Sequence, residues 1–215
     1  MIISMSRLLL LVSLFPLGLF ADDVTPLKEA LKKQSNHQTV VVEFRQTKKI
    51  PALTDEIKTM GKLWLIPGKA FRWELGKPSR QTIIFNGGDV LVLDEVKKTG
   101  ERLSKDHKAV KPLFLTLGMG KDATFEGLSK IFTITSTNQA KGRFLATFSP
   151  KPRALKKVIK SLLMQVNLQT SFMERIGWVQ KDGTEAMTEF FKPTLNGKIS
   201  AARFTAKEAS YTWKK

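Results

Sequence analysis

The residues that could do chemistry are few in this chain of 215 residues. It contains two histidines, His37 and His107, and no cysteine. A shared catalytic or metal site would require the fold to bring both histidines together, and metals usually need a third strong ligand. The sequence contains neither a G-x-S-x-G elbow nor a phosphate-binding P-loop, and no carboxylate pair stands out as an acid–base couple. We therefore expect no enzyme, no metal and no cofactor, with an active site assembled from distant residues as the alternative.

The other side chains with a possible binding role are large and apolar. Residues 61–75 read GKLWLIPGKAFRWEL, which predicts two short strands joined by a Pro-Gly turn. In the second strand Phe71, Trp73 and Leu75 point to one face, and Arg72 points to the other. Ordinary core is the simpler interpretation of such a stripe. A pocket for an apolar ligand is the alternative.

Short antiparallel strands must position this stripe. Residues 81–86 (QTIIFN) predict a third strand that turns on Asn86-Gly87-Gly88, and residues 89–95 return. Asn-Gly between apolar runs is a strong hairpin signal. Residues 59–95 thus predict a four-stranded meander, which needs a covering layer to hide its apolar face.

The rest of the chain predicts further strands and a few small helices. Thr25–Ser35 reads as a short amphipathic helix with Pro26 at its first position. The apolar run 112–120 begins with Pro112 and ends in glycines, which suits a second short helix. Helical turns are expected within 123–132 and 152–160, and strands within 39–47, 101–104, 131–135, 142–149, 161–170, 173–180, 184–191 and 198–205.

These elements predict an α+β class with about ten antiparallel strands and two or three helices. A long antiparallel sheet tends to curl. Helices over the open mouth of a curled sheet would enclose a concave apolar chamber.

The first residues predict export. Arg7 precedes an apolar run of 13 residues (8–20), which is too short for a comfortable membrane span. The small Ala21 follows and is succeeded by two aspartates. We expect residues 1–21 to be a signal peptide cleaved after Ala21, with an uncleaved anchor as the alternative, and residues 22–215 to form one domain.

The chain is strongly basic, with 36 Lys and Arg against 19 Asp and Glu, a formal net charge of +17. Such a chain prefers anionic partners. Basic residues beside aromatic ones could bind nucleic acid. Export makes anionic lipid or an acidic receptor the better expectation.

Several stretches together resemble the periplasmic lipoprotein carrier family, LolA. They are VEFRQT (42–47), the central block GKLWLIPGKAFRWEL with PSRQTIIFNGG, PLFLTL (112–117), FLATFSPKP (144–152) and KDGTEAMTEFFKPTLNGKISAARF (181–204). Each piece is weakly specific, whereas their order and spacing are fairly specific. Ile66 stands where members often carry an arginine before the turn proline, and the end of the chain is short and lacks the family's Pro-Gly tail.

The resemblance implies an incomplete, strongly curved antiparallel barrel with a lid of short helices. It implies a monomeric periplasmic carrier that binds lipoprotein acyl chains without covalent chemistry. Its partners would be an inner-membrane transporter, an outer-membrane acceptor and, transiently, anionic membrane. Arg45 or Arg72 could replace the missing latch arginine. The expected lipid-binding residues are Phe44, Trp64, Phe71, Trp73, Leu75, Ile83, Phe85, Leu113, Phe114 and Leu117. The alternatives are a carrier of another lipid or glycolipid for a different exporter, and a sensor with the same fold.

Overall fold

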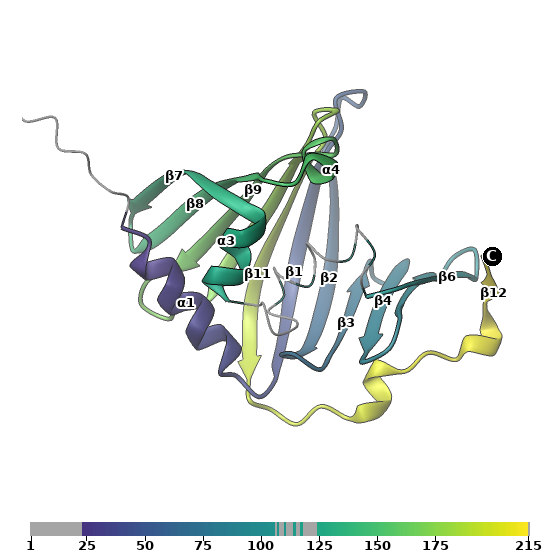
Figure 1. Ribbon diagram of the computed structural model, residues 1–215. Helices are drawn as coiled ribbons and strands as arrows, with labels where there is room; N and C mark the ends of the chain where they lie inside the picture. The colour runs from purple at the N-terminus through teal and green to yellow at the C-terminus, as the bar shows by residue number, and fades with distance from the viewer. Residues whose placement is uncertain are drawn as a thin grey trace, which may run out of the picture.

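The computed structural model describes residues 23–105, 107, 110, 114, 117 and 124–214 (Figure 1). The expected signal peptide, residues 1–21, and the expected lid residue Leu113 lie outside this set. Within it, no helix is long and apolar enough to cross a membrane.

A single sheet of twelve strands makes up most of the described chain (Figure 1). The strands follow the order β12-β6-β5-β4-β3-β2-β1-β11-β10-β9-β8-β7, and their pairing is antiparallel except between β12 and β6. Their bounds are β1 Val40–Lys49, β2 Ile57–Ile66, β3 Ala70–Leu75, β4 Gln81–Asn86, β5 Val90–Asp94, β6 Thr99–Leu103, β7 Phe132–Ala140, β8 Arg143–Pro150, β9 Ile159–Asn167, β10 Met173–Gln180, β11 Glu185–Leu195 and β12 Thr212–Trp213. The sheet is open rather than closed. One large, mostly antiparallel sheet with a few helices confirms the expected α+β class.

Local turn chemistry shapes the meander as expected. The amide of Lys69 donates to the carbonyl of Ile66 at 3.0 Å, and Gly68 has a φ of +72°. Proline followed by a glycine with positive φ is the signature of a type II turn. The β2–β3 hairpin therefore follows from the Pro67-Gly68 dipeptide.

The helices are few and short. They are α1 Thr25–Ser35, α3 Phe125–Ile131 and α4 Arg153–Lys156, with the 3-10 turns η1 Ala201–Phe204 and η2 Glu208–Ser210. α1 has the predicted bounds, but its N-cap is Val24 and the amide of Thr25 bonds to Asp23 Oδ1 at 3.0 Å instead. Figure 1 shows α1 and α3 over one face of the β7–β11 side of the sheet, which we call the inner face.

Two apolar clusters line the inner face. The first packs α1 and α3 on β7–β10 through residues such as Leu27, Leu128 and Phe148. The second lies on β1–β5 and is the candidate site. Phe190 on β11 contacts both clusters. The inner face is therefore one apolar surface covered by different segments at its two ends.

The end of the chain departs from the sequence prediction. Residues 198–205 were expected to form a strand, but they contain η1. β11 already pairs with β1 on one side and β10 on the other, so no position beside it is free for a following hairpin strand. Residues 196–214, the C-terminal segment, instead cross the outer face, where Ile84, Leu91 and Leu93 pack against its apolar side chains.

The C-terminal segment is held by specific contacts. Tyr211 Oη donates to Glu95 Oε2 at 2.7 Å. Trp213 packs on Gly100, where any Cβ would lie 2.8 Å from the indole. Burial and the neighbouring Glu95 carboxylate raise the pKa of Tyr211 to about 12. Since β12 pairs with β6, the segment also covers that edge of the sheet.

Candidate functional site

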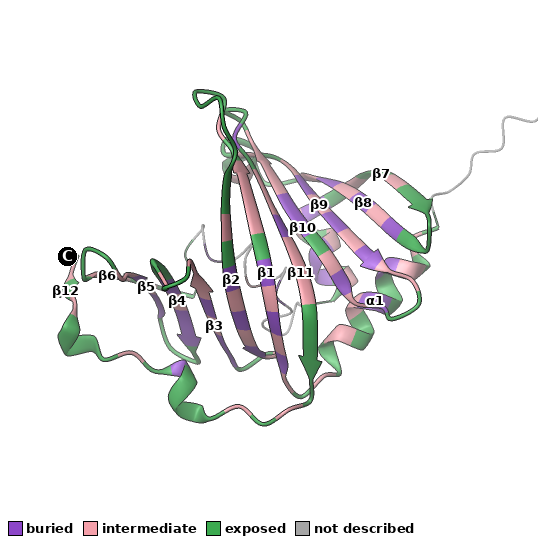
Figure 2. Ribbon diagram, turned by 180° about the vertical axis from the view of Figure 1, so that it is seen from behind, coloured by how far each residue is buried: buried purple, intermediate pink, exposed green. Residues whose placement is uncertain are grey.

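The candidate site is the apolar cluster on the inner face of β1–β5, which we call the inner aromatic cluster. Its buried members are Val40, Val42, Phe44, Leu63, Leu65, Phe71, Trp73, Phe85, Val90, Val110 and Leu117. Leu75, Ile83, Val92, Leu103, Phe114, Phe172 and Phe190 pack against them and are partly buried. Figure 2 shows buried residues on most strands of the sheet, among them β3 and β4.

Strand alternation and register bring the rings together. Phe71 on β3 pairs with Phe85 on β4, and their ring centroids lie 6.1 Å apart. Trp73 lies 4.2 Å from Phe44 of β1 and 6.1 Å, edge to face, from Phe190 of β11. Aromatic pairs at such separations add about 0.5–1.5 kcal/mol each beyond area burial. The result is a continuous aromatic surface across strands that are distant in sequence.

A glycine makes room for the deepest ring. Phe44 is fully buried and lies opposite Gly61 on β2. A Cβ at Gly61 would lie 2.1 Å from Phe44 Cζ and 2.4 Å from the Glu74 carbonyl oxygen. No side chain fits there without displacing these atoms, so glycine is required at position 61 for the Phe44 ring to pack directly on the backbone of β2.

Three described residues between β6 and α3 cover this cluster from outside the sheet. Val110 and Leu117 are 3% and 5% exposed, and Phe114 is half-buried. Phe114 lies edge-on to Phe85 at 4.7 Å and to Phe71 at 5.9 Å. We call Val110, Phe114 and Leu117 the covering residues. Phe114 and Leu117 belong to the run 112–120, in which the lid helix was expected, whereas Val110 precedes that run.

Most of the expected lipid-binding residues meet on this surface. The structure brings together Phe44, Phe71, Trp73, Leu75, Ile83, Phe85, Phe114 and Leu117. Sequence reasoning missed the buried members Val40, Val42, Leu63, Leu65, Val90 and Val110, and the partly buried members Val92, Leu103, Phe172 and Phe190. Glu43 between Val42 and Phe44 marks the shared face of these two residues in the sequence. In contrast, Leu63 and Leu65 alternate with residues that are also apolar on β2, and Phe190 joins through the β1–β11 pairing alone.

Trp64 does not belong to the inner aromatic cluster, contrary to the sequence prediction. It was expected to line the chamber, but it lies on the outer face, opposite Arg72 across the β2–β3 ladder. The guanidinium of Arg203 stacks over its ring at 4.6 Å. The neighbours Leu63 and Leu65 take the inner face, and period-2 alternation then sends Trp64 outward.

The two arginines expected to latch the lid also point outward, so that expectation is wrong. Arg72 bonds to Glu74 at 2.5 Å and donates to the Thr205 carbonyl oxygen at 3.2 Å, which ties it to the C-terminal segment. Arg45 forms an ion pair with Glu189. Arg45 follows Phe44 on β1, and Arg72 lies between Phe71 and Trp73 on β3. Adjacent side chains on a strand point to opposite faces, so both arginines lie on the face of the sheet away from the covering residues.

The outer-face charges form their own network. Glu189 on β11 lies opposite both Arg45 and Arg175, and the hydrogen bond from Arg45 holds the pKa of Glu189 below its ordinary value. Burial would raise the pKa of Glu174, but its hydrogen bonds from Asn167, Arg143 and Gln165 outweigh that effect and lower it. The charged residues thus decorate the outer face, and the inner aromatic cluster is left apolar.

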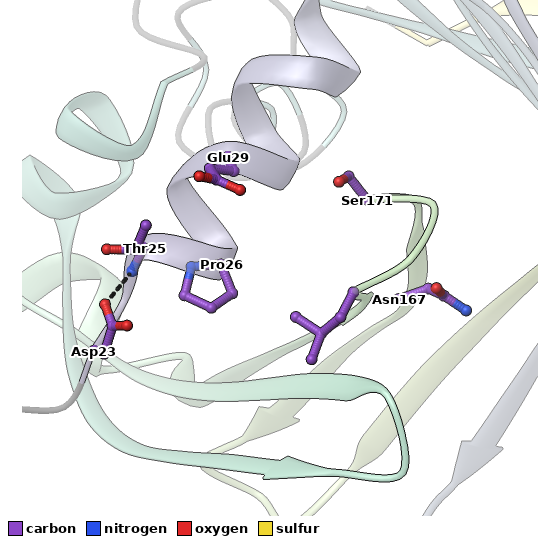
Figure 3. Close-up of a pocket in the computed structure, with 7 residues that line it drawn as sticks. Asp23, Thr25, Pro26, Glu29, Asn167 and Ser171 are labelled. Atoms are coloured by element: carbon purple, nitrogen blue, oxygen red, sulfur yellow. Dashed lines mark hydrogen bonds between the residues drawn. The ribbon is translucent and has the colours of Figure 1, made fainter.

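Two pockets lined by described residues lie beside α1. One, of about 160 Å³, is lined by Asp23, Thr25, Pro26, Glu29, Asn167, Leu168 and Ser171 (Figure 3). The other, of about 260 Å³, lies between α1 and α3. In the part of the chain that the structure describes, no three His, Cys, Asp or Glu side chains gather as a metal site would require.

Several solved structures are similar to this chain. An uncharacterized conserved protein from Thermus thermophilus has a TM-score of 0.52 at 7% identity, covering 87% of this chain and 99% of its own. A LolA superfamily protein from Nitrosomonas europaea has a TM-score of 0.43 at 10% identity, covering 83% and 96%. The MucA/MucB complex of Pseudomonas aeruginosa has a TM-score of 0.43 at 10% identity, covering 85% and 60%.

At these identities the Thermus structure supports a shared fold and nothing about function. No curated protein matches the chain. The model of one protein family does match, the one described as outer membrane lipoprotein carrier protein LolA, over residues 35–207. That range contains every strand from β1 to β11, the inner aromatic cluster and the covering residues. The chain therefore belongs to the outer membrane lipoprotein carrier family LolA.

Proposed function

We propose that this protein carries the acyl chains of lipoproteins across the periplasm, from the inner to the outer membrane, in the inner aromatic cluster. The observation that carries the proposal is that the covering residues belong to no strand, yet bury the aromatic face of β1–β5. Such a face can exchange one apolar cover for another. The covering residues would lift as a lid, and acyl chains would take their place.

The energetics favour an apolar container for this task. An acyl chain gains about 0.8 kcal/mol per buried CH₂, so it cannot cross water unprotected at useful concentrations. The same surface holds Phe71, Phe85 and Phe114 in edge-to-face contacts that an acyl chain could replace with contacts of similar kind. Binding and release then need no covalent chemistry, in keeping with a carrier rather than an enzyme.

The remaining parts of the proposal concern the route. Residues 1–21 would direct export and be removed after Ala21, which leaves residues 22–215 as one periplasmic domain, a monomer. An inner-membrane transporter would supply the cargo and an outer-membrane acceptor would receive it. Intact-mass measurement of the exported protein tests the first step, and retention of Met1 on a membrane-bound chain would contradict it.

Native mass spectrometry of protein purified from its own periplasm tests the cargo. We expect bound lipoprotein, or mass differences that match acyl chains. A fluorescent fatty acid added to delipidated protein should bind, and Phe114→Ala should weaken that binding. Val96→Ala is the control, because Val96 is 70% exposed and is not a member of the cluster. Protein that arrives without lipid and binds no apolar probe would refute the proposal.

A second candidate is a carrier of another lipid or glycolipid for a different exporter. Ile66 occupies the place of the family's latch arginine, and the structure commits Arg45 and Arg72 to outer-face partners. Release would then depend on apolar contacts of the covering residues rather than on an arginine latch. The same mass spectra distinguish the two candidates by the identity of the bound lipid.

A further inference from the structure

Exposed apolar side chains collect at one end of the sheet. Of the large hydrophobic residues that the structure describes as exposed, four lie there: Leu53, Ile57, Met60 and Val158. Leu53 is 49% exposed, Ile57 44% and Val158 57%. Scattered single residues of this kind need no explanation, but a group from separate segments indicates an interaction surface.

The strand pairing brings these segments together. Lys49 at the end of β1 lies opposite Glu185 at the start of β11, and Lys48 lies opposite Ile57. The amide of Lys181 bonds to the carbonyl of Val158 at 2.9 Å. Figure 1 shows α4 beside the end of the β1–β2 hairpin at the top of the view. We call residues 48–60, 153–160 and 181–185 the basic tip.

Positive charge surrounds the apolar side chains of the basic tip. Its sequence contains eight lysines and arginines against four acidic residues, and all eight except Lys48 are exposed. Two of the acids have partners close by: Glu56 lies 3.5 Å from Lys58, and Asp182 accepts the amide of Thr184 at 2.8 Å. The acids therefore offset the basic side chains only in part.

We propose that the basic tip docks the protein reversibly on an anionic lipid bilayer. Aliphatic side chains ringed by lysines suit the membrane interface, where apolar groups enter the acyl boundary and cations meet the headgroups. Long lysine stems can lie along the apolar surface while their ammonium groups reach anionic lipid. A folded acidic protein would match the charge but gives no reason for exposed aliphatic residues on two separate segments.

This surface is distinct from the proposed cargo site. The inner aromatic cluster begins on β2 at Leu63, beyond Gly61, and none of its members belongs to the basic tip. Docking would hold the carrier at a membrane while cargo enters or leaves. The two proposals can therefore fail separately.

The absence of cysteine allows a site-specific test. Leu53→Cys, labelled with the environment-sensitive dye NBD, reports on the tip. Leu195→Cys, labelled in the same way, is the matched control, because Leu195 is 39% exposed at the opposite end of the sheet, where β11 ends. Each protein is mixed with vesicles of phosphatidylglycerol and phosphatidylethanolamine, or of phosphatidylcholine alone, at 50 and 500 mM NaCl in the final buffer (about 14 and 4 Å Debye lengths).

We expect a blue shift and brighter NBD emission at position 53 with anionic vesicles at low salt, and little change at position 195. High salt or phosphatidylcholine vesicles should remove the response. Equal responses at both positions, no response at position 53, or a response that does not need anionic lipid would each overturn the proposal. None of these readouts requires acyl cargo.

A charge-matched pair of variants separates local docking from net charge. Replacing Lys156, Lys157 and Lys160 with glutamine should weaken vesicle partition about tenfold or more at low salt, since each lysine near an anionic surface contributes appreciably. Replacing the exposed lysines Lys97, Lys198 and Lys207 with glutamine removes the same number of positive charges outside the basic tip. Equal weakening by both triple variants would mean that overall charge, not the basic tip, drives the attraction.

Discussion

Replacing Leu117 with glutamate tests whether the covering residues form a separable lid or part of one solid core. Leu117 is 5% exposed in the inner aromatic cluster. Leu128 on α3 is a matched leucine, 3% exposed in the other inner-face cluster. Either substitution puts a carboxylate in apolar surroundings, which is costly unless the charge is neutralised or reaches water. The two sites differ in how the charge can escape.

A lid gives the charge at position 117 a limited escape. Moving the lid away from the sheet exposes Val110, Phe114 and residue 117. Burial of each large side chain is worth about 1.5–3 kcal/mol, so opening the lid costs roughly 4–9 kcal/mol for all three relative to the closed wild type. Phe114 is already half-buried and contributes less than this, whereas the buried rings of Phe71 and Phe85, which Phe114 contacts, would be uncovered as well. The twelve-stranded sheet and the α1–α3 cluster remain intact. At Leu128, α3 cannot move without uncovering Leu27 and Phe132, so the charge has no local escape.

We therefore expect Leu117→Glu to keep its β-sheet circular dichroism and a cooperative, lowered melt, while it loses retention of a fluorescent fatty acid. Leu128→Glu should fail to fold. Burial raises the pKa of an introduced glutamate, so the closed form prefers the protonated acid, and retention should recover as the pH falls toward 4. If Leu117→Glu unfolds like Leu128→Glu and the wild type binds no apolar probe, these residues are ordinary core and the carrier proposal is wrong.

Three further substitutions test the structure itself. Gly61→Ala should cost about 1–3 kcal/mol in urea unfolding through overpacking, whereas Gly88→Ala, with nothing near its Cβ, should be close to neutral; equal effects would contradict the close approach. Tyr211→Phe should cost about 1 kcal/mol at pH 7 by removing its hydrogen bond to Glu95. Because the pKa of Tyr211 rises from 10.0 to about 12, this contribution is complete below pH 10 and lost as the pH approaches 12; a variant that matches the wild type in alkaline melts at every pH would refute this. Glu189→Gln should cost under about 1 kcal/mol at neutral pH, because the ion pair with Arg45 is part-exposed. Since the pKa of Glu189 is lowered from 4.5, its contribution to stability is complete above pH 4.5 and is lost as the pH falls through the lowered pKa, so the variant should lose less stability in acid than the wild type. An unchanged acid profile would show that the pair does not contribute to stability.

Much of the strand pattern could be predicted because it depends on local rules. Phe71 and Trp73 alternate with charged residues, so their shared face follows from the pleat alone. Pro67-Gly68 dictates the hairpin turn, and α1 has its predicted bounds because its apolar spacing and Pro26 are local signals. The candidate site inherits most of its residues from this alternation.

The face of Trp64 could not be predicted in this way. Leu63, Trp64, Leu65 and Ile66 are all apolar, so the sequence contains no alternation that marks an inner side. The pairing of β2 with β3 and the packing of Phe44 on Gly61 determine which residues of β2 face the inner side, and they place Trp64 on the outer face. Hydrophobicity by itself cannot choose between two apolar faces; the register can.

Long-range pairing decided the rest. Residues 198–205 have strand-like composition, but β1 and β10 occupy both edges of β11, so the chain crosses the outer face instead. Phe190 joins the inner aromatic cluster because β1 pairs with β11. The same pairing brings residues 48–60 and 181–185 together in the basic tip, and the bond from the Lys181 amide to the Val158 carbonyl adds residues 153–160. The sequence by itself determined which residues are apolar, which alternate and where the chain turns, since these depend on neighbours along the chain. Only the tertiary structure decided which faces meet, because that depends on which strand edges remain free after the sheet has assembled.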